Sequence, residues 1–499
     1  MTKKNTPPDK LIPSIPTDFE KIAAKFQENP IEFKRQFMPS TEPHLTRTER
    51  NDKLEKLWDE FEKLVQDGEP DEIIRCMDSI TQLDPENAMA WLNKAAALDK
   101  VGEYKEALEC FNKSIELKPK FAGTWYNKGI TLRKLGRNKE AIECYTKATE
   151  LDPEDIDTWN NLGHLLDKLH RDEEALECYT KSIDLKPKFA GTWFNKGITL
   201  RKLDRNEEAI ECYTKATELD PENIDTWNNL GHLLDKLHRD EEALECYTKA
   251  VELNPKDANT WVNKGFILLQ LGRNEEALEY YTKAVELDPK DANAWANKGF
   301  LLADIDELEE ALECYDKAIE LDPKDANSWY NKGIILRKLD RKEESLKCYT
   351  KSIELNPKFV SPWNNKAGLL DELERYDECL KLMEKAVKYV KSDEGMSRCI
   401  NWKGVAILKS TGNYSESLKC FEEAYRLDPT QTLALNNMAD SLLHLDRALE
   451  ALEIINKVLE IDKTKALYWK TKGEILEKLG KHEEALKCFD KIIELDPER

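Results

Sequence analysis

Apolar residues recur along this chain with a period of 34 residues, and inside each period they follow the spacing of two helices. In the segment that begins at Trp125, apolar or small residues fall at i, i+4 and i+7, and Ala141, Tyr145 and Ala148 repeat that spacing further on. Such a stripe is typical of a helix that buries one face. Each period therefore predicts two helices that pack through their apolar stripes.

Residues that end or begin helices separate the two stripes. Gly136 can adopt the left-handed backbone conformation that closes a helix, and Asn138 is a favourable N-cap for the next one. Pro153 has no N–H donor for a continuing helix and marks the loop to the following period. The period is therefore predicted to be a helix-turn-helix hairpin.

Nine tryptophans mark the period without a slip. They are Trp91, Trp125, Trp159, Trp193, Trp227, Trp261, Trp295, Trp329 and Trp363. A hairpin of two helices cannot bury both of its apolar stripes alone, so neighbouring hairpins must stack. The chain is thus predicted to be all-α, an α-solenoid superhelix of about thirteen helix-turn-helix repeats of 34 residues.

Three segments are expected along the chain. Residues 54–397 carry repeats 1 to 10 and residues 398–499 carry repeats 11 to 13, and an insertion of four residues around 391–395 breaks the phase between them. Residues 1–53 lie outside the repeats. They combine prolines with a short amphipathic helix near residues 17–26, which either caps the first repeat or lies as an arm in the groove.

The order Trp, Gly, Ala, aromatic, Ala and Pro, at offsets 0, +4, +16, +20, +23 and +28, resembles the tetratricopeptide repeat (TPR) family over nearly the whole chain. The resemblance implies that the first helix of each hairpin lines a concave surface on which extended ligands bind. It also implies a non-enzymatic protein-binding scaffold. The sequence agrees, because it contains no Gly-rich phosphate loop, no HExxH and no GxSxG motif.

The charge and the cysteines of the chain indicate which classes of ligand are unfavourable. The formal net charge is −22, and the acidic residues gather on the second helices, which disfavours nucleic acid and anionic membranes. The chain has no apolar run of membrane-spanning length and no secretory leader, so a cytoplasmic location is expected. Ten of the twelve cysteines share one repeat position, which favours reduced packing thiols, and neither a metal nor a cofactor is expected.

An asparagine two residues after each tryptophan is the main candidate for ligand binding. At 100° per residue it points away from the stripe that begins at the tryptophan, into the groove. The row consists of Asn93, Asn127, Asn161, Asn195, Asn229, Asn263, Asn297, Asn331 and Asn365, and Asn437 continues it. An amide can bond to the main chain of an extended peptide, and the row resembles the asparagine ladder of O-linked N-acetylglucosamine transferase repeats, without that enzyme's catalytic domain. The alternative is that the asparagines bond the neighbouring helix.

Basic residues near the asparagines complete the predicted site. They are Lys134, Lys168, Lys202 and Lys236, with Arg133 and Arg201 one position earlier in their repeats. The partner is therefore expected to be an extended, partly acidic protein segment. Two other functions stay open. One is a structural homo-oligomer joined through the ends of the solenoid, for example a homodimer through the C-terminal repeat, where Leu486 and Ile493 have no following hairpin to cover them. The other is a subunit that recruits substrates for a separate enzyme.

One pair of repeats is duplicated within the array. Residues 121–181 and 189–249 differ at only four positions, among them Tyr126 against Phe194. Two nearly identical surfaces therefore follow one another, and a ligand with repeated motifs would gain from both.

Overall fold

The computed structural model describes residues 46–67 and 69–495, and every regular element in these residues is a helix. Two compact units divide the chain between Pro255 and Lys256. They are called here the N-terminal unit and the C-terminal unit. The predicted arm and helix of residues 1–45 lie outside the described residues.

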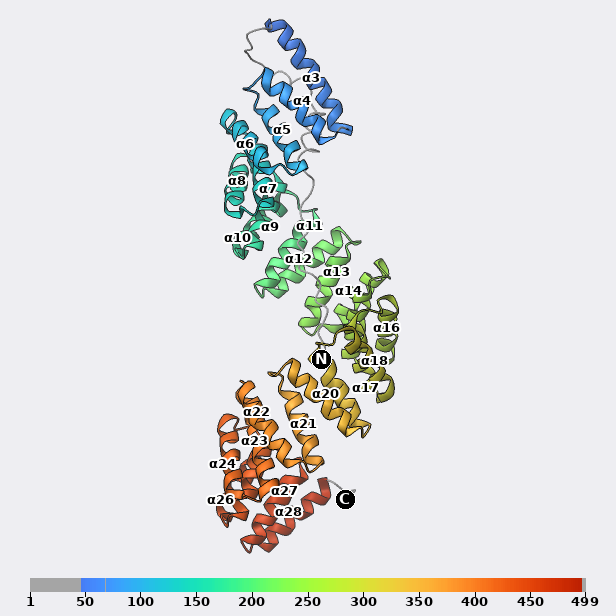
Figure 1. Cartoon of the computed structure of the whole chain (residues 1–499), viewed down its shortest axis with the longest axis vertical. Helices are drawn as coiled ribbons and strands as arrows, with labels where there is room; N and C mark the ends of the chain where they lie inside the picture. Colours follow the sequence, from blue (N-terminus) through green and yellow to red (C-terminus); the bar gives the residue numbers. More distant parts are fainter. Residues whose placement is uncertain (1–45, 68, 496–499) are drawn as a thin grey trace. The chain divides into compact units, whose positions relative to one another are not determined.

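In the described part of the N-terminal unit the chain forms twelve helices, and Figure 1 shows their order. They are α3 (Arg47–Asp67), α4 (Pro70–Leu83), α5 (Ala88–Val101), α6 (Tyr104–Leu117), α7 (Ala122–Lys134), α8 (Asn138–Leu151), α9 (Ile156–Lys168), α10 (Asp172–Leu185), α11 (Ala190–Lys202), α12 (Asn206–Leu219), α13 (Ile224–Lys236) and α14 (Asp240–Leu253). The first of them begins at Arg47, inside the segment that the sequence places before the repeats.

Residues 256–495 of the C-terminal unit, which the structure describes, form fourteen helices. They are α15 (Ala258–Gln270), α16 (Asn274–Leu287), α17 (Ala292–Asp304), α18 (Leu308–Leu321), α19 (Ala326–Lys338), α20 (Lys342–Leu355), α21 (Val360–Glu372), α22 (Tyr376–Tyr389), α23 (Asp393–Thr411), α24 (Tyr414–Leu427), α25 (Thr432–His444), α26 (Ala448–Ile461), α27 (Ala466–Lys478) and α28 (His482–Leu495). Consecutive helices pair into hairpins, thirteen in the described residues, so the predicted all-α solenoid is confirmed.

Small residues let the two helices of a hairpin approach closely. In the hairpin of α7 and α8, Ala141, Tyr145 and Ala148 are at most 1% exposed, as their spacing predicts. A Cβ atom built on Gly129 of α7 would lie 2.7 Å from Cε1 of Tyr145. Glycine is therefore required at this position, because any side chain would push the tyrosine ring out of the core.

Left-handed residues end the first helix of many hairpins. Gly136 has φ of +74°, which confirms the predicted turn. His170, Asp204 and His238 occupy the same repeat position with φ of 55 to 58°. This conformation is unfavourable for residues with a side chain, so in these repeats the packing of the two helices enforces the turn.

The prediction that Asn138 is an N-cap is wrong. Helix α8 begins at Asn138, and its N-cap is Arg137, which makes no side-chain cap bond. Instead, the guanidinium of Arg137 donates to both carboxylate oxygens of Glu140 at 2.7 and 2.6 Å. An exposed ion pair thus replaces the expected amide cap at the start of the second helix.

The repeating tryptophans lie at the edge of the core. Trp363 is 0% exposed, but the other eight are only half-buried. The indole Nε1 of Trp125 donates to the carbonyl of Pro119 at 3.0 Å, and that of Trp159 donates to Pro153 at 2.9 Å. Each of these two tryptophans therefore joins its first helix to the loop that precedes it. Both stand at the start of the predicted stripe but are only half-buried there.

The four-residue insertion lengthens one helix. Helix α22 ends at Tyr389, and α23 spans 19 residues, whereas the other first helices of the C-terminal unit span 13. The side chain of Ser392 caps α23 by accepting from the N–H of Gly395 at 3.3 Å. The break in phase is thus absorbed at the start of α23.

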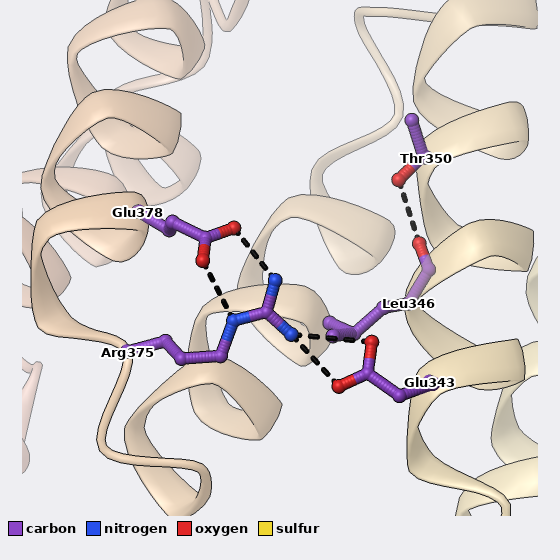
Figure 2. Close-up of polar contacts among 5 residues, drawn as sticks. All are labelled: Glu343, Leu346, Thr350, Arg375 and Glu378. Carbon is purple, nitrogen blue, oxygen red and sulfur yellow. Dashed lines mark hydrogen bonds and ion pairs between the residues drawn. The ribbon is translucent and has the colours of Figure 1, made fainter.

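An arginine at the start of the second helix also links successive repeats. Arg375 precedes α22 and donates from Nε to Glu378 at 2.7 Å and from Nη1 to Glu343 of α20 at 2.9 Å (Figure 2). In the same view, Thr350 donates to the carbonyl of Leu346 at 2.6 Å. Glu343 belongs to the preceding hairpin, so this guanidinium bridges two repeats on the second-helix side.

Candidate functional site: the first-helix face

The first helices of successive repeats pack side by side. In the N-terminal unit α5 contacts α7 and α9 contacts α11, and in the C-terminal unit α21 contacts α23, α23 contacts α25 and α25 contacts α27. The surface that these helices form is called here the first-helix face. It carries all of the residues that the sequence predicts to bind a ligand.

Most of the predicted asparagines are buried on this face. Their exposed fractions are 0% for Asn93, 8% for Asn127, 4% for Asn161, 2% for Asn195, 2% for Asn229 and 8% for Asn297, whereas Asn263, Asn331 and Asn365 are half-buried. Six of the nine are therefore buried, so little of their surface faces the groove into which the helical angle points them.

Part of the hydrogen-bonding capacity of the asparagines is used inside the protein. Nδ2 of Asn161 donates to the carbonyl of Asp157 and to the hydroxyl of Tyr126, both at 3.0 Å. Tyr126 belongs to the first helix of the preceding repeat. Asn365 donates to the hydroxyl of Tyr330 in the same way, also at 3.0 Å. In these two repeats the asparagine bonds the neighbouring helix.

The duplicated repeat leaves its asparagine with more capacity. Asn229 corresponds to Asn161, but Phe194 stands where Tyr126 would offer a hydroxyl. Nδ2 of Asn229 donates to the carbonyl of Asp225 at 2.9 Å. Its second N–H has no partner among the described residues. Asn93 differs again, because both polar atoms of its amide are buried without a hydrogen bond to any described residue.

Two of the four predicted lysines donate hydrogen bonds to carboxylates of the protein. Nζ of Lys134 donates to Asp99 and Nζ of Lys202 donates to Asp167, each at 2.5 Å. The carboxylates also accept from threonine hydroxyls, since Thr199 donates to Asp167 at 2.6 Å. Asp167 is 1% exposed. These lysines therefore join successive repeats and are less available to a ligand than the sequence suggested.

The remaining predicted cations are arranged differently. Lys168 is exposed and makes no ion pair with a described residue, while Lys236 lies 3.6 Å from Asp204, with more than half of each side chain exposed. Arg133 and Arg201 are half-buried. Lys168 and Lys236 are therefore the predicted lysines that can meet an acidic ligand.

His164 lies between these charges on α9. Burial, together with the neighbouring Arg133, lowers the pKa of its imidazole from 6.5 to about 4. Lys168 and Lys202 act in the same direction, and Asp167 opposes them. The ring is therefore neutral near pH 7.

The first-helix face of the C-terminal unit contains a hollow of about 990 Å³. Helices α21, α23, α25 and α27 contribute to its wall. Trp402, Leu433 and Leu467 supply apolar surface, and Leu433 and Leu467 are 43% and 47% exposed. The hollow can therefore receive bulky apolar side chains of a ligand.

Polar groups surround this apolar surface. Asn437 donates to Oδ1 of Asn401 at 3.0 Å, and both line the hollow. Oδ1 of Asn364 and Oδ1 of Asp371 are buried there without a partner among the described residues. Arg398 lies at the edge and pairs with a carboxylate one helical turn away. The hollow thus offers hydrogen-bond acceptors beside an apolar surface.

Sequence reasoning missed this hollow because the late repeats depart from the consensus. The row of asparagines predicted as the binding site ends at Asn365 and resumes only at Asn437, whereas the hollow is built mainly by residues after Asn365. A signal was present in the sequence. Leu433 and Leu467 occupy a first-helix position at which the repeats from Trp125 to Trp363 carry glycine or a polar residue.

Comparison with protein-family models shows the family. A tetratricopeptide repeat model matches residues 88–121, 122–155, 156–189, 190–223, 224–257, 258–291, 292–325, 326–359 and 466–499, and two further tetratricopeptide repeat models match 348–381 and 408–466. The chain belongs to the tetratricopeptide repeat family. Its repeats define a protein–protein interaction scaffold.

Solved structures of the same kind are similar to parts of the chain. YrrB, described as a TPR protein with an unusual peptide-binding site, is 32% identical with a TM-score of 0.35, and the match covers 38% of this chain and 98% of YrrB. MamA is 24% identical with a TM-score of 0.33, covering 34% and 93%. Yeast Tom70 is 18% identical with a TM-score of 0.39, covering 90% and 98%. Among curated proteins, none matches this chain.

Among the described residues, no helix combines the length and the apolar character needed to cross a membrane.

Proposed function

We propose that this protein is a non-enzymatic scaffold whose first-helix face holds an extended segment of a partner protein. The hollow of about 990 Å³ between α21, α23, α25 and α27 carries the proposal. Ligand sites are concave, mostly apolar and furnished with a few polar groups that fix orientation. The hollow is concave and sets exposed leucines beside polar side chains, on the face that the repeats line with their first helices.

The partner segment places an apolar side chain against Leu433 and Leu467. The exposed parts of these leucines lose contact with water when the segment binds, which supplies the hydrophobic contribution. The side-chain amides of Gln431 and Asn437 line the hollow and can bond the main chain of the segment. Apolar contact thus anchors the segment, and these polar groups orient it.

In the N-terminal unit, the asparagine row contributes where its amides retain capacity. Asn229 is only 2% exposed, but its amide has a second N–H that no described residue uses, so a peptide carbonyl that reaches this amide would find a donor. Lys168 and Lys236 favour acidic side chains nearby. The segment is therefore extended and carries some acidic residues.

The experiment selects peptides that bind the protein from a displayed library and measures their affinity by fluorescence anisotropy. Leu433→Glu together with Leu467→Glu places charge on the hollow, and we expect binding to weaken at least about tenfold, the equivalent of one lost apolar anchor. Both leucines are exposed, so the helices should remain intact.

Leu449→Glu is the matched control. Leu449 lies on α26, is 70% exposed and does not line the hollow. Affinity should therefore stay within about twofold of wild type. The proposal fails if the selected peptides bind the Leu433 and Leu467 double variant as tightly as wild type, or if the control weakens binding equally.

A second candidate function, self-association through the C-terminal repeat, is favoured by the exposure of α28. Ile493 is 67% exposed, whereas the same repeat position is 5 to 9% exposed in Ile183, Val285, Ile319, Ile353 and Leu459. Leu486 is 62% exposed, against 6% for Leu346. An uncovered apolar surface often marks an interface, and a second copy of the chain is the proposed occupant.

A further inference from the structure

A second hollow lies on the other side of the repeats, within the N-terminal unit. It measures about 670 Å³ and runs between the second helices α12 and α14, with α13 as its floor. It is called here the α12–α14 furrow. None of its lining residues lines the hollow between α21, α23, α25 and α27 or belongs to the predicted asparagine row. The inference drawn from it is therefore independent of the proposed function.

The floor and walls of the furrow are apolar. Trp227, Leu230 and Leu234 project from α13 at i, i+3 and i+7, while Ile210 and Leu244 flank them from α12 and α14. Leu230 and Leu234 are 5% and 3% exposed, but Ile210, Trp227 and Leu244 are half-buried. A ligand in the furrow would therefore cover apolar surface that now faces solvent.

The rim of the furrow is acidic. Glu218, Glu241, Glu242 and Glu245 line it, with Lys249 as the single cation. Glu242 pairs with an arginine of its own helix turn and Glu218 pairs with a lysine, but exposed pairs of this kind contribute little. Glu245 makes no ion pair with a described residue. The rim therefore favours a ligand with positive charge on both sides of an apolar anchor.

The residues that line the furrow occur twice in the sequence. All fourteen of its lining residues recur unchanged 68 positions earlier, including Ile142, Trp159, Leu162, Glu173, Leu176 and Glu177. The local bonds recur as well: Thr149 and Thr217 each donate at 2.8 Å to the carbonyl three residues before, and Trp159 and Trp227 each donate at 2.9 Å to a proline carbonyl. The helices α8, α9 and α10 therefore present the same chemistry as α12, α13 and α14.

We propose that the two furrows bind basic amphipathic helices of a partner, one in each furrow. Two parallel walls of helix with an apolar floor fit the apolar face of a third helix, whose anchors recur at i, i+3, i+4 and i+7. Lysine and arginine residues on either side of that face meet the glutamates of the rim. A partner with two such helices gains avidity from the duplication.

The test uses a displayed library of helical peptides of about 18 residues with fixed apolar anchors and free choice of charge elsewhere. Selected peptides should carry an excess of lysine and arginine. Isothermal titration should give two peptides per chain. Glu177→Lys with Glu245→Lys should weaken binding about tenfold, because one rim attraction in each furrow becomes a repulsion.

Single variants and a charge-matched control make the test specific. Glu245→Lys alone should leave one site of full affinity and one weakened site. Glu154→Lys with Glu222→Lys changes the net charge equally in two exposed loops outside the furrows and should have little effect. Circular dichroism checks that every variant stays folded.

Several outcomes would overturn the proposal. Selected peptides without a basic excess would contradict the role of the rim. Equal weakening by the loop control would show that only the overall charge matters. Competition with peptides that need Leu433 and Leu467 would place the ligand on the first-helix face, and concentration-dependent self-association that the furrow variants abolish would show that the occupant is a second copy of this chain.

Discussion

Lys202 reaches back across a repeat boundary and donates from Nζ to Oδ2 of Asp167 at 2.5 Å. The carboxylate is 1% exposed, and its other oxygen accepts from Thr199 at 2.6 Å. Burial makes this pair more consequential than an exposed one, because a buried charge that loses its partner is costly. The pair fixes α9 against α11 at the centre of the predicted site.

Replacing Asp167 with asparagine should destabilise this junction by about 1 to 3 kcal/mol, since the amide keeps an acceptor for Thr199 but leaves the lysine without its counter-charge. Hydrogen exchange of α9 and α11 is the measurement. Asp99→Asn serves as comparison, because Asp99 has the same partners in Thr131 and Lys134 but its side chain is 12% exposed. A smaller effect at Asp167 than at Asp99 would contradict the importance of burial.

The duplicated repeats allow the structural and the binding roles of the asparagine row to be separated, because Asn161 and Asn229 occupy the same position with different partners. Asn161→Ala should lower stability, because it removes a bond to Tyr126 as well as one to its own helix, together roughly 1 to 2 kcal/mol. Asn229→Ala should cost less stability and should weaken the binding of groove peptides more. Tyr126→Phe makes the first repeat resemble its duplicate. In that background, Asn161→Ala should cost as little stability as Asn229→Ala does in wild type. Equal stability losses and unchanged peptide affinity would show that both asparagines are purely structural.

Gly197→Ala should destabilise the hairpin of α11 and α12 by about 1 to 3 kcal/mol. A Cβ atom there would lie 2.7 Å from Cε1 of Tyr213, which is 0% exposed and has no room to move. Gly368→Ala is the control, because the nearest atom would be 3.5 Å away on Trp402. In α21 the alanine should be neutral or stabilise by up to about 1 kcal/mol, through helix propensity. Urea unfolding followed by circular dichroism compares the two, and similar losses would contradict the close-packing argument.

His164 should make stability depend on pH. Its pKa is lowered to about 4 in the folded chain, mainly by burial, against an ordinary value of 6.5. The unfolded chain therefore binds more protons between these values, so the contribution is intact above pH 6.5 and is lost as pH falls toward 4. The loss should reach up to about 3 kcal/mol. The measurement is the unfolding free energy of wild type and of His164→Gln from pH 7.5 to 4. All other titrating groups are present in both proteins, so the difference between the two curves gives the contribution of His164. A difference that stays constant over this range would contradict the lowered pKa.

Self-association through α28 is tested by sedimentation. We expect wild type to dimerise with a Kd below about 100 μM, equivalent to about −5.5 kcal/mol. Leu486→Glu with Ile493→Glu should abolish the dimer without unfolding the helix, since both residues are more than 60% exposed. Leu449→Glu on α26 is the control. A wild-type monomer throughout this concentration range would exclude the homodimer.

The sequence alone determined the repeat architecture. The spacing of Trp125, Ala141 and Tyr145 states which residues share a helical face, and the turn at Gly136 follows from its conformational freedom. These features depend on residues close together in the chain, and the period repeats the same information in every hairpin. Fold class, family and the number of repeats could therefore be predicted.

Only the tertiary structure decided which side chains are available to a partner. Helical angles placed Asn161 and Lys202 in an open groove, but the adjacent first helices bury the amide and pair the lysine with Asp167. The exposed leucines beside Trp402 and the furrow beside Trp227 depend on residues from three or more helices. Exposure is set by the distance between neighbouring repeats, and that distance follows from the packing of many side chains at once, which the period of a single repeat does not contain.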